Sequence, residues 1–171
     1  MVHIYCGDGK GKTTAAMGLA LRCAGSGRRA LVLQFLKDGS SSELAPLSRT
    51  EGAEVVPQTR AFGFTWTLSP EEREEAGIYY SGLLEETWEK AAAGGYGLLV
   101  LDEALGACAA GLIDEGRLLA LLDSAPEGLE VVLTGRGPSQ ALLDRADYVT
   151  EMRKVKHPFD RGVAARRGVE Y

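Results

Sequence analysis

The sequence of 171 residues contains only two histidines and three cysteines, and this scarcity excludes several kinds of site. His3 and His157 are isolated, so no Ser/His/Asp or Cys/His catalytic set is evident. The cysteines are odd in number and lie far apart, at Cys6, Cys23 and Cys108, which fits neither a disulfide framework nor a CxxC metal site. We therefore expect a cytoplasmic protein with reduced thiols.

Long apolar runs are also missing. No stretch of 18 or more apolar residues occurs, so we expect no membrane-spanning segment. Val2 to Cys6 runs directly into a Gly/Lys loop, which is not typical of a signal peptide. The net charge is −5, from 19 Lys and Arg against 24 Asp and Glu. This balance gives no overall attraction to nucleic acid, and we expect neither a nucleic acid nor a membrane as partner.

Glycine, in contrast, is abundant, at 22 residues, but no G-X-Y period appears and apolar runs separate the glycines. Ser69, Pro70 and Glu72 have the spacing of a capping box, and Gly94 follows as a stop, so a helix is expected between them. No linker or repeat divides the chain, so we predict one domain, residues 1–171. The alternating elements predict an α/β fold with a mostly parallel sheet of about five to six strands and helices on both faces. The expected strands are 2–6, 30–36, 53–56, 98–103, 130–135 and 148–150, and the other expected helices are 13–24, a short one around 118–122, and one near 140–146.

A glycine-rich loop joins the first expected strand to the first helix: Gly7-Asp8-Gly9-Lys10-Gly11-Lys12-Thr13-Thr14. Backbone N–H groups at such a junction can hold phosphates, while Lys12 supplies a charge and Thr13 can ligate Mg²⁺. The usual pattern, G-x-x-x-x-G-K-[ST], needs a glycine where this chain has Cys6, so the loop is one residue short. A glycine-rich turn without a ligand is the alternative. The strand before and the helix after favour nucleotide binding and a P-loop NTPase-like (RecA-like) fold.

Two acids follow the apolar run 98–101, and carboxylates at the carboxyl end of a strand suit Mg²⁺ or Mn²⁺. With Thr13, Asp102 and Glu103 are the predicted metal ligands. The alternative is a strand that ends in an acidic turn. Arg136, after the expected strand 130–135, fits either the same crevice or a solvated turn.

Taken in order, the motifs resemble those of the ATP:corrinoid adenosyltransferases of the cob(I)yrinic acid a,c-diamide type. The resemblance covers essentially the whole chain. It is carried by the shortened loop with Arg22 late in the next helix, Gln34-Phe35-Leu36-Lys37, Gly63-Phe64-Thr65-Trp66, Val100-Leu101-Asp102-Glu103, Leu133-Thr134-Gly135-Arg136-Gly137, Lys156-His157-Pro158-Phe159-Asp160 and Gly168-Val169-Glu170-Tyr171.

This resemblance implies transfer of the 5′-deoxyadenosyl group of ATP to Co(I) of a corrinoid (cobalamin, cobinamide or cobyrinic acid a,c-diamide), with release of tripolyphosphate, in adenosylcobalamin biosynthesis or salvage. It also implies that ATP lies in the shortened loop in the reverse of the usual sense, which leaves C5′ open to attack. Co(I) is a strong nucleophile with no proton to lose, so no general base is needed. The implied ligands of ATP are Gly7, Asp8, Gly9, Lys10, Gly11, Lys12, Thr13, Thr14, Arg22, Lys37, Glu43 and Arg136, with Lys10 and Lys12 stabilising the departing triphosphate.

Phe64 and Trp66 match the pair that is thought to pack against the lower face of the corrin and displace the axial base. A four-coordinate Co(II) lacks the donor that stabilises it, so its reduction to Co(I) becomes easier. From spacing alone, packing in the core or in a dimer is the favoured interpretation, and the resemblance shifts the balance to the functional one. The resemblance further implies a homodimer and a flavoprotein or reduced-flavin electron donor.

The last segment, residues 151–171, has six Lys and Arg, three acids and little periodicity. We expect an irregular segment packed on the domain, and the alternative is a solvated basic extension. Two other functions stay open: a small-molecule kinase or ATPase that cleaves at the γ-phosphate, and a nucleotide-dependent corrinoid carrier without turnover. A GTPase is not favoured because no N-K-x-D motif is present.

Overall fold

Six strands form one parallel sheet, in the order β3-β2-β4-β5-β1-β6, in the computed structural model, which describes residues 1–170. The strands are β1 (Val2–Cys6), β2 (Ala30–Gln34), β3 (Ala53–Val55), β4 (Leu98–Asp102), β5 (Glu130–Thr134) and β6 (Tyr148–Glu151). The helices are α1 (Lys12–Gly25), α2 (Leu44–Leu47), α3 (Pro70–Ala93), α4 (Ala104–Ala109), α5 (Glu115–Asp123) and α6 (Gln140–Arg145), with a 3₁₀ helix η1 (Pro158–Arg161).

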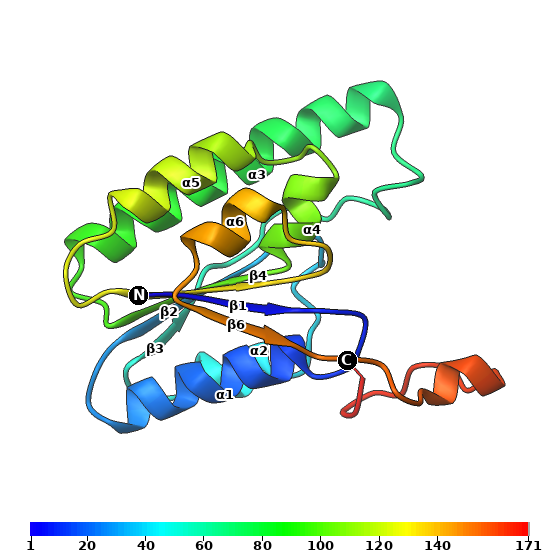
Figure 1. Cartoon of the computed structure of the whole chain (residues 1–171), viewed down its shortest axis with the longest axis horizontal. Helices are drawn as coiled ribbons and strands as arrows, with labels where there is room; N and C mark the ends of the chain where they lie inside the picture. The colour runs from blue at the N-terminus through cyan, green and yellow to red at the C-terminus, as the bar shows by residue number, and fades with distance from the viewer. Residues whose placement is uncertain (171) are drawn as a thin grey trace.

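Helices cover both faces of the sheet: α1 and α2 lie on one side, and α3, α4, α5 and α6 lie on the other (Figure 1). Every residue of β2 and of β4 is buried, which is why both strands are apolar up to their last residue, Gln34 or Asp102, rather than alternating. The predicted α/β architecture is confirmed. The short helices α2 and α4 were not predicted.

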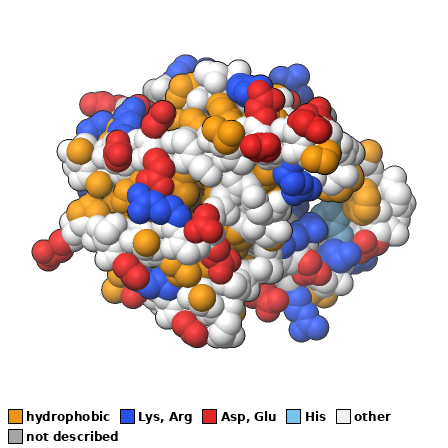
Figure 2. Space-filling model, turned by 90° about the horizontal axis from the view of Figure 1, so that it is seen from above, with side chains coloured by type: hydrophobic (Ala, Val, Ile, Leu, Met, Phe, Trp, Pro, Cys, Tyr) orange, Lys and Arg blue, Asp and Glu red, His pale blue; other side chains and the backbone are white. Residues whose placement is uncertain are grey.

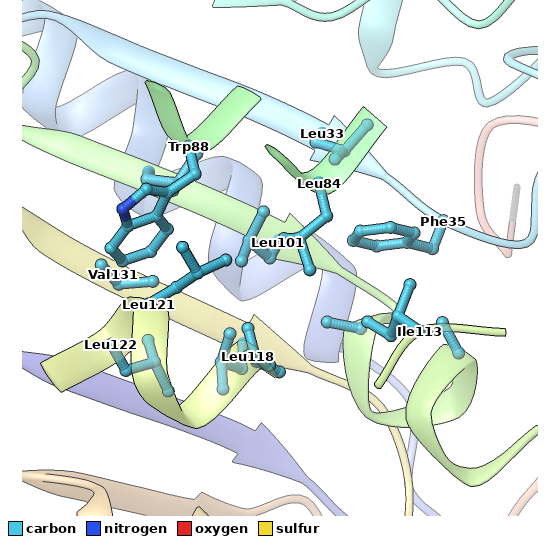
Figure 3. Packing of buried hydrophobic residues seen from close by; sticks show 14 of the residues in the cluster. Leu33, Phe35, Leu84, Trp88, Leu101, Ile113, Leu118, Leu121, Leu122 and Val131 are labelled. Atoms are coloured by element: carbon cyan, nitrogen blue, oxygen red, sulfur yellow. The ribbon is translucent and has the colours of Figure 1, made fainter. Parts of the chain in front are cut away.

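The larger core lies between the sheet and helices α3 and α5 (Figure 3). Leu84 and Trp88 of α3 meet Leu121 of α5 over Leu101 and Val131 of the sheet. Each such side chain contributes about 1.5–3 kcal/mol by leaving water. This core fixes the sheet, and with it the strand ends.

Helix α3 begins with the predicted capping box. The Ser69 hydroxyl accepts the N–H of Glu72 at 3.1 Å, and the Glu72 carboxylate accepts the N–H of Ser69 at 2.8 Å. One turn on, the guanidinium of Arg73 donates to the carbonyl of Thr65 at 2.8 Å and to that of Ala110 at 2.7 Å. The start of α3 therefore holds the loop that carries the predicted aromatic pair.

The carboxyl ends of the strands meet at one edge of the sheet, on the right in Figure 1. Because β5 lies between β1 and β4, Thr134 at its end separates the glycine-rich loop from Asp102. In open α/β sheets this edge is where ligands bind. Among the helices of residues 1–170, none combines the length and the apolar character needed to cross a bilayer.

Candidate nucleotide and metal site

Lys12 is the first residue of α1 and folds back over the glycine-rich loop. Its Nζ donates to the carbonyl oxygens of Gly7 and Gly9, each at 2.8 Å. Burial lowers the pKa of the Lys12 ammonium, and the charge of Arg136 lowers it further. Two carbonyl oxygens thus hold a largely desolvated cation at a helix N-terminus, and a phosphate oxygen can replace them.

Asp102, at the end of β4, is completely buried and accepts hydrogen bonds from four side chains. Its Oδ1 accepts from the hydroxyl of Thr134 at 2.6 Å. Its Oδ2 accepts from Gln34 Nε2 at 2.9 Å, Lys37 Nζ at 3.1 Å and the Thr13 hydroxyl at 3.2 Å. We call these five residues the Asp102 cluster. It brings the first turn of α1 and the ends of three strands into contact.

The Asp102 cluster fits a Mg²⁺ ion. Mg²⁺ binds through one or two protein oxygens together with water and phosphate oxygens, and the Thr13 hydroxyl and the Asp102 carboxylate lie side by side. Gln34 Oε1 is buried and has no hydrogen-bond partner within residues 1–170, so it can accept from a metal-bound water. Burial raises the pKa of the adjacent Glu103 carboxyl, and the charge of Asp102 adds to this. Within residues 1–170, no group of three or more His, Cys, Asp or Glu is arranged to hold a metal ion.

Most of the predicted nucleotide and metal residues are brought together at this edge. Arg136 follows β5, and its charge lowers the pKa of Lys12, second to burial. The exposed members of the group are Asp8, Lys10, Thr14 and Arg136. Gly9 differs from the others, because its N–H donates to the carbonyl of Met152 at 2.6 Å and is not directed to a ligand.

Arg22 is the exception to this grouping. It lies in the last turn of α1, about 15 Å along the helix axis from Lys12 at 1.5 Å per residue. There it lines a cleft of about 420 Å³ together with His3, Glu130 and Tyr148, which belong to other elements. The structure thus places Arg22 at the opposite end of α1 from Lys12, and its assignment as a nucleotide ligand stays a prediction. Glu43, half-buried just before α2, stays a prediction.

Phe64 and Trp66 form a stacked pair, with ring centroids 4.7 Å apart and ring planes 10° from parallel. Phe64 is 68% exposed and Trp66 is 77% exposed, so neither ring belongs to the core of the chain. Their loop follows β3 and leads into α3, at the same carboxyl end of the sheet as the glycine-rich loop (Figure 1). Two adjacent exposed rings suit contact with a large planar ligand or a partner.

Sequence reasoning did not assign two members of the Asp102 cluster, Gln34 and Thr134. Each is a polar residue at the end of an otherwise apolar strand, and each is buried. A buried polar side chain needs a partner. A polar residue that closes an apolar run next to a predicted carboxylate strand was therefore the available signal.

The parallel sheet, the phosphate loop and the acidic strand end together are typical of a nucleotide-binding α/β protein. The structure is similar to the cytoplasmic domain of the type VII secretion ATPase EccC from Thermomonospora curvata, with a TM-score of 0.50 and 18% identity, over 95% of this chain and 21% of that one. This similarity supports the fold alone.

The family is shown by sequence comparison. The model for the ATP:corrinoid adenosyltransferase family BtuR/CobO/CobP matches residues 1–171, and the chain belongs to this family. It is 36% identical to a corrinoid adenosyltransferase of Pseudomonas aeruginosa, over 98% of this chain and 82% of that protein. It is 34% identical to the corrinoid adenosyltransferase of Escherichia coli K12 and to CobA of Salmonella typhimurium, in each case over 100% of this chain and 85% of the relative. The resemblance inferred from the motifs is confirmed.

Proposed function

We propose that this protein transfers the 5′-deoxyadenosyl group of ATP to Co(I) of a corrinoid and releases tripolyphosphate. One observation carries the proposal: in a chain of this family, the shortened phosphate loop and the Asp102 cluster share an edge of the sheet with the exposed Phe64–Trp66 pair. The first two provide for a triphosphate, and the aromatic pair provides for a large flat second substrate.

The reaction needs no proton transfer from the protein. An electron pair of Co(I) forms the cobalt–carbon bond to C5′, while the C5′–O bond breaks and its electrons leave with the triphosphate. The protein must align the two substrates and stabilise the leaving charge. Lys12 is suited to exchange its two carbonyl partners for phosphate oxygens, and Lys10, Lys37 and Arg136 place further positive charge at the same edge.

Mg²⁺ would be held by Thr13 and Asp102, with Glu103 adjacent, and would neutralise part of the triphosphate charge. Gln34 and Thr134 orient the Asp102 carboxylate for this task. Phe64 and Trp66 would contact the lower face of the corrin and favour reduction of Co(II).

The other parts of the proposal rest on the family. They are a homodimer, a flavoprotein or reduced flavin as electron donor, and a cytoplasmic location, where the free thiols of Cys6, Cys23 and Cys108 stay reduced.

The test is an anaerobic incubation with ATP, Mg²⁺ and chemically reduced cobalamin or cobinamide, followed by analysis of both products. A light-sensitive alkylcobalt product together with stoichiometric tripolyphosphate is expected. Release of ADP instead identifies a kinase or ATPase, and binding of both substrates without product identifies a carrier. Either of these results rejects the proposal.

A further inference from the structure

After β6 the chain passes directly along the phosphate loop. The carbonyl of Met152 accepts the N–H of Gly9 at 2.6 Å. Two residues on, the backbone N–H of Lys154 donates to Oδ1 of Asp8 at 2.9 Å. We call residues 152–154 the strap. It joins the C-terminal segment to the loop at two consecutive loop positions.

The strap also explains two glycines of the loop. A Cβ atom on Gly7 or on Gly9 would lie 2.5 Å from the carbonyl oxygen of Met152, closer than real Cβ contacts come. The contact involves backbone atoms that are fixed, since Met152 N–H also donates to the carbonyl of Cys6 at 2.8 Å. Glycine is therefore required at both positions by the strap itself, independently of any phosphate.

The hydrogen bond from Gly9 to Met152 reduces the number of loop N–H groups that can bind a ligand. The Gly9 N–H belongs to the strap, so the donors left for phosphate begin at Lys10. The loop is one residue shorter than the usual pattern, and Lys12 spans it by bonding Gly7 and Gly9. The strap gives this short loop a support from outside the loop, through the bonds to Gly9 and Asp8.

Asp8 is an unexpected residue in a phosphate-binding loop because of its negative charge. An exposed carboxylate in a phosphate loop repels the triphosphate, so charge alone argues against an acid here. Its one backbone partner outside the loop is the N–H of Lys154, and this hydrogen bond is the main cause that lowers the pKa of Asp8. The hydrogen bond to Lys154 thus gives a structural reason for a negatively charged residue in this loop.

We propose that the strap holds the shortened loop in its phosphate-binding shape, and that Asp8 is a positioning residue which locks the strap by accepting the N–H of Lys154. The inference deepens the proposed function, on which it rests only in requiring that the loop bind a triphosphate. If this is so, the C-terminal segment contributes to ATP affinity through the backbone of the strap, residues 152–154.

Four variants separate this role from charge. Asp8→Ala removes the acceptor, whereas Asp8→Asn removes the charge and keeps an oxygen that can accept. Lys154→Pro removes the donating N–H, whereas Lys154→Ala keeps it and removes the side chain that pairs with Asp160. Asp114→Ala is the matched control, since Asp114 is an exposed acid that accepts a backbone N–H, from Arg117, far from the loop in sequence.

The first readout is hydrogen exchange of residues 7–13 in the full chain without ligand, and it does not depend on the proposed activity. Exchange in the loop should accelerate about tenfold in Asp8→Ala and Lys154→Pro, less in Asp8→Asn, and stay unchanged in Lys154→Ala and Asp114→Ala. The second readout is calorimetric binding of Mg-ATP and of tripolyphosphate. Affinity should fall about tenfold in Asp8→Ala and in Lys154→Pro, and the variant that carries both substitutions should lose no more than either one. Lys154→Ala and Asp114→Ala should bind as tightly as the wild type.

If Asp8 acts only through its charge, its removal should strengthen tripolyphosphate binding instead of weakening it. If Asp8→Ala binds tripolyphosphate as tightly as the wild type or more tightly, with unchanged loop exchange, the strap has no positioning role. The same conclusion follows if Asp8→Asn and Asp8→Ala behave alike, or if Lys154→Pro matches Lys154→Ala. A chain that shows the expected exchange pattern but makes no alkylcobalt product keeps the strap and loses the proposed reaction.

Discussion

The hydroxyl of Thr134 donates a 2.6 Å hydrogen bond to Oδ1 of Asp102 and accepts the backbone N–H that follows Asp102, from Glu103, at 2.9 Å. One side chain thus fixes both the carboxylate and the backbone turn after β4. The turn is unusual, because Glu103 has φ 59°, in the left-handed region. Thr134 supports the proposed metal ligand Asp102 from the neighbouring strand.

We expect Thr134→Val to destabilise the protein by about 1–3 kcal/mol, because it leaves a buried carboxylate oxygen and a backbone N–H without their partner. Urea unfolding measures this change, and Mg-ATP affinity should fall with it. Thr87→Val is the matched control. Thr87 is buried in α3 and its hydroxyl has no hydrogen-bond partner within residues 1–170, so the same substitution there should be neutral or stabilising. Equal losses in the two variants would contradict the assigned role of Thr134.

Lys12→Ala should abolish adenosyl transfer, with ATP affinity reduced at least tenfold, because the variant loses the buried cation at the N-terminus of α1. Single-turnover assays with saturating ATP separate the binding loss from the chemical loss. Lys10→Ala is the comparison, since Lys10 is exposed at the same loop. It should be affected less, because an exposed charge is screened by water and salt. Retention of full activity by Lys12→Ala would exclude the loop as the triphosphate site.

Trp66→Ala should leave ATP binding unchanged and slow the reaction that starts from Co(II). The reaction from chemically reduced Co(I) should proceed at the normal rate, because only the reduction step uses the lower-face contact. Ile78→Ala, which removes another exposed apolar side chain, is the control and should affect neither assay. If Trp66→Ala matches the wild type from Co(II), the ring has a different role, such as contact with a partner.

The sequence was sufficient to predict where the strands and long helices lie along the chain, because their patterns are local. The capping box at Ser69 and the stop at Gly94 are contacts between near neighbours, and both are present. Separations across the fold are harder to predict. Arg22 shares a helix with Lys12, but a sequence match does not show that the helix carries it about 15 Å away. The partnership of Thr134 with Asp102 depends on which strand lies between β1 and β4, and periodicity carries no information on that order.

An ion pair of Glu54, in the outermost strand β3, should make the free energy of unfolding depend on pH. Lys90 and Tyr96 both donate to the Glu54 carboxylate, and these bonds, that from Lys90 first, lower the pKa of Glu54 below its usual value of 4.5. A lowered pKa stabilises the fold above the unfolded value and loses that effect as the pH falls through the folded value.

Glu54→Gln should therefore destabilise the protein at pH 7 by less than about 1 kcal/mol, since the group is partly exposed. The difference from the wild type should shrink when urea unfolding is repeated well below pH 4.5. Glu51→Gln, at an exposed neighbouring position, should show no such convergence. On the face seen in Figure 2, acidic and basic side chains are interspersed, so no single-sign field is expected to mask this local effect.

The two arginines predicted to bind ATP should now behave differently. Arg136→Ala should weaken Mg-ATP binding several-fold, because this guanidinium lies close enough to lower the pKa of Lys12, second to burial. The loss should diminish at high salt, since Arg136 is exposed. Arg22→Ala should leave Mg-ATP binding unchanged at every salt concentration, because Arg22 lines the cleft with His3 and Glu130 at the far end of α1. Calorimetric titration of both variants decides the point: an Arg22→Ala loss as large as that of Arg136→Ala would require the nucleotide to reach a cleft that the phosphate loop does not touch.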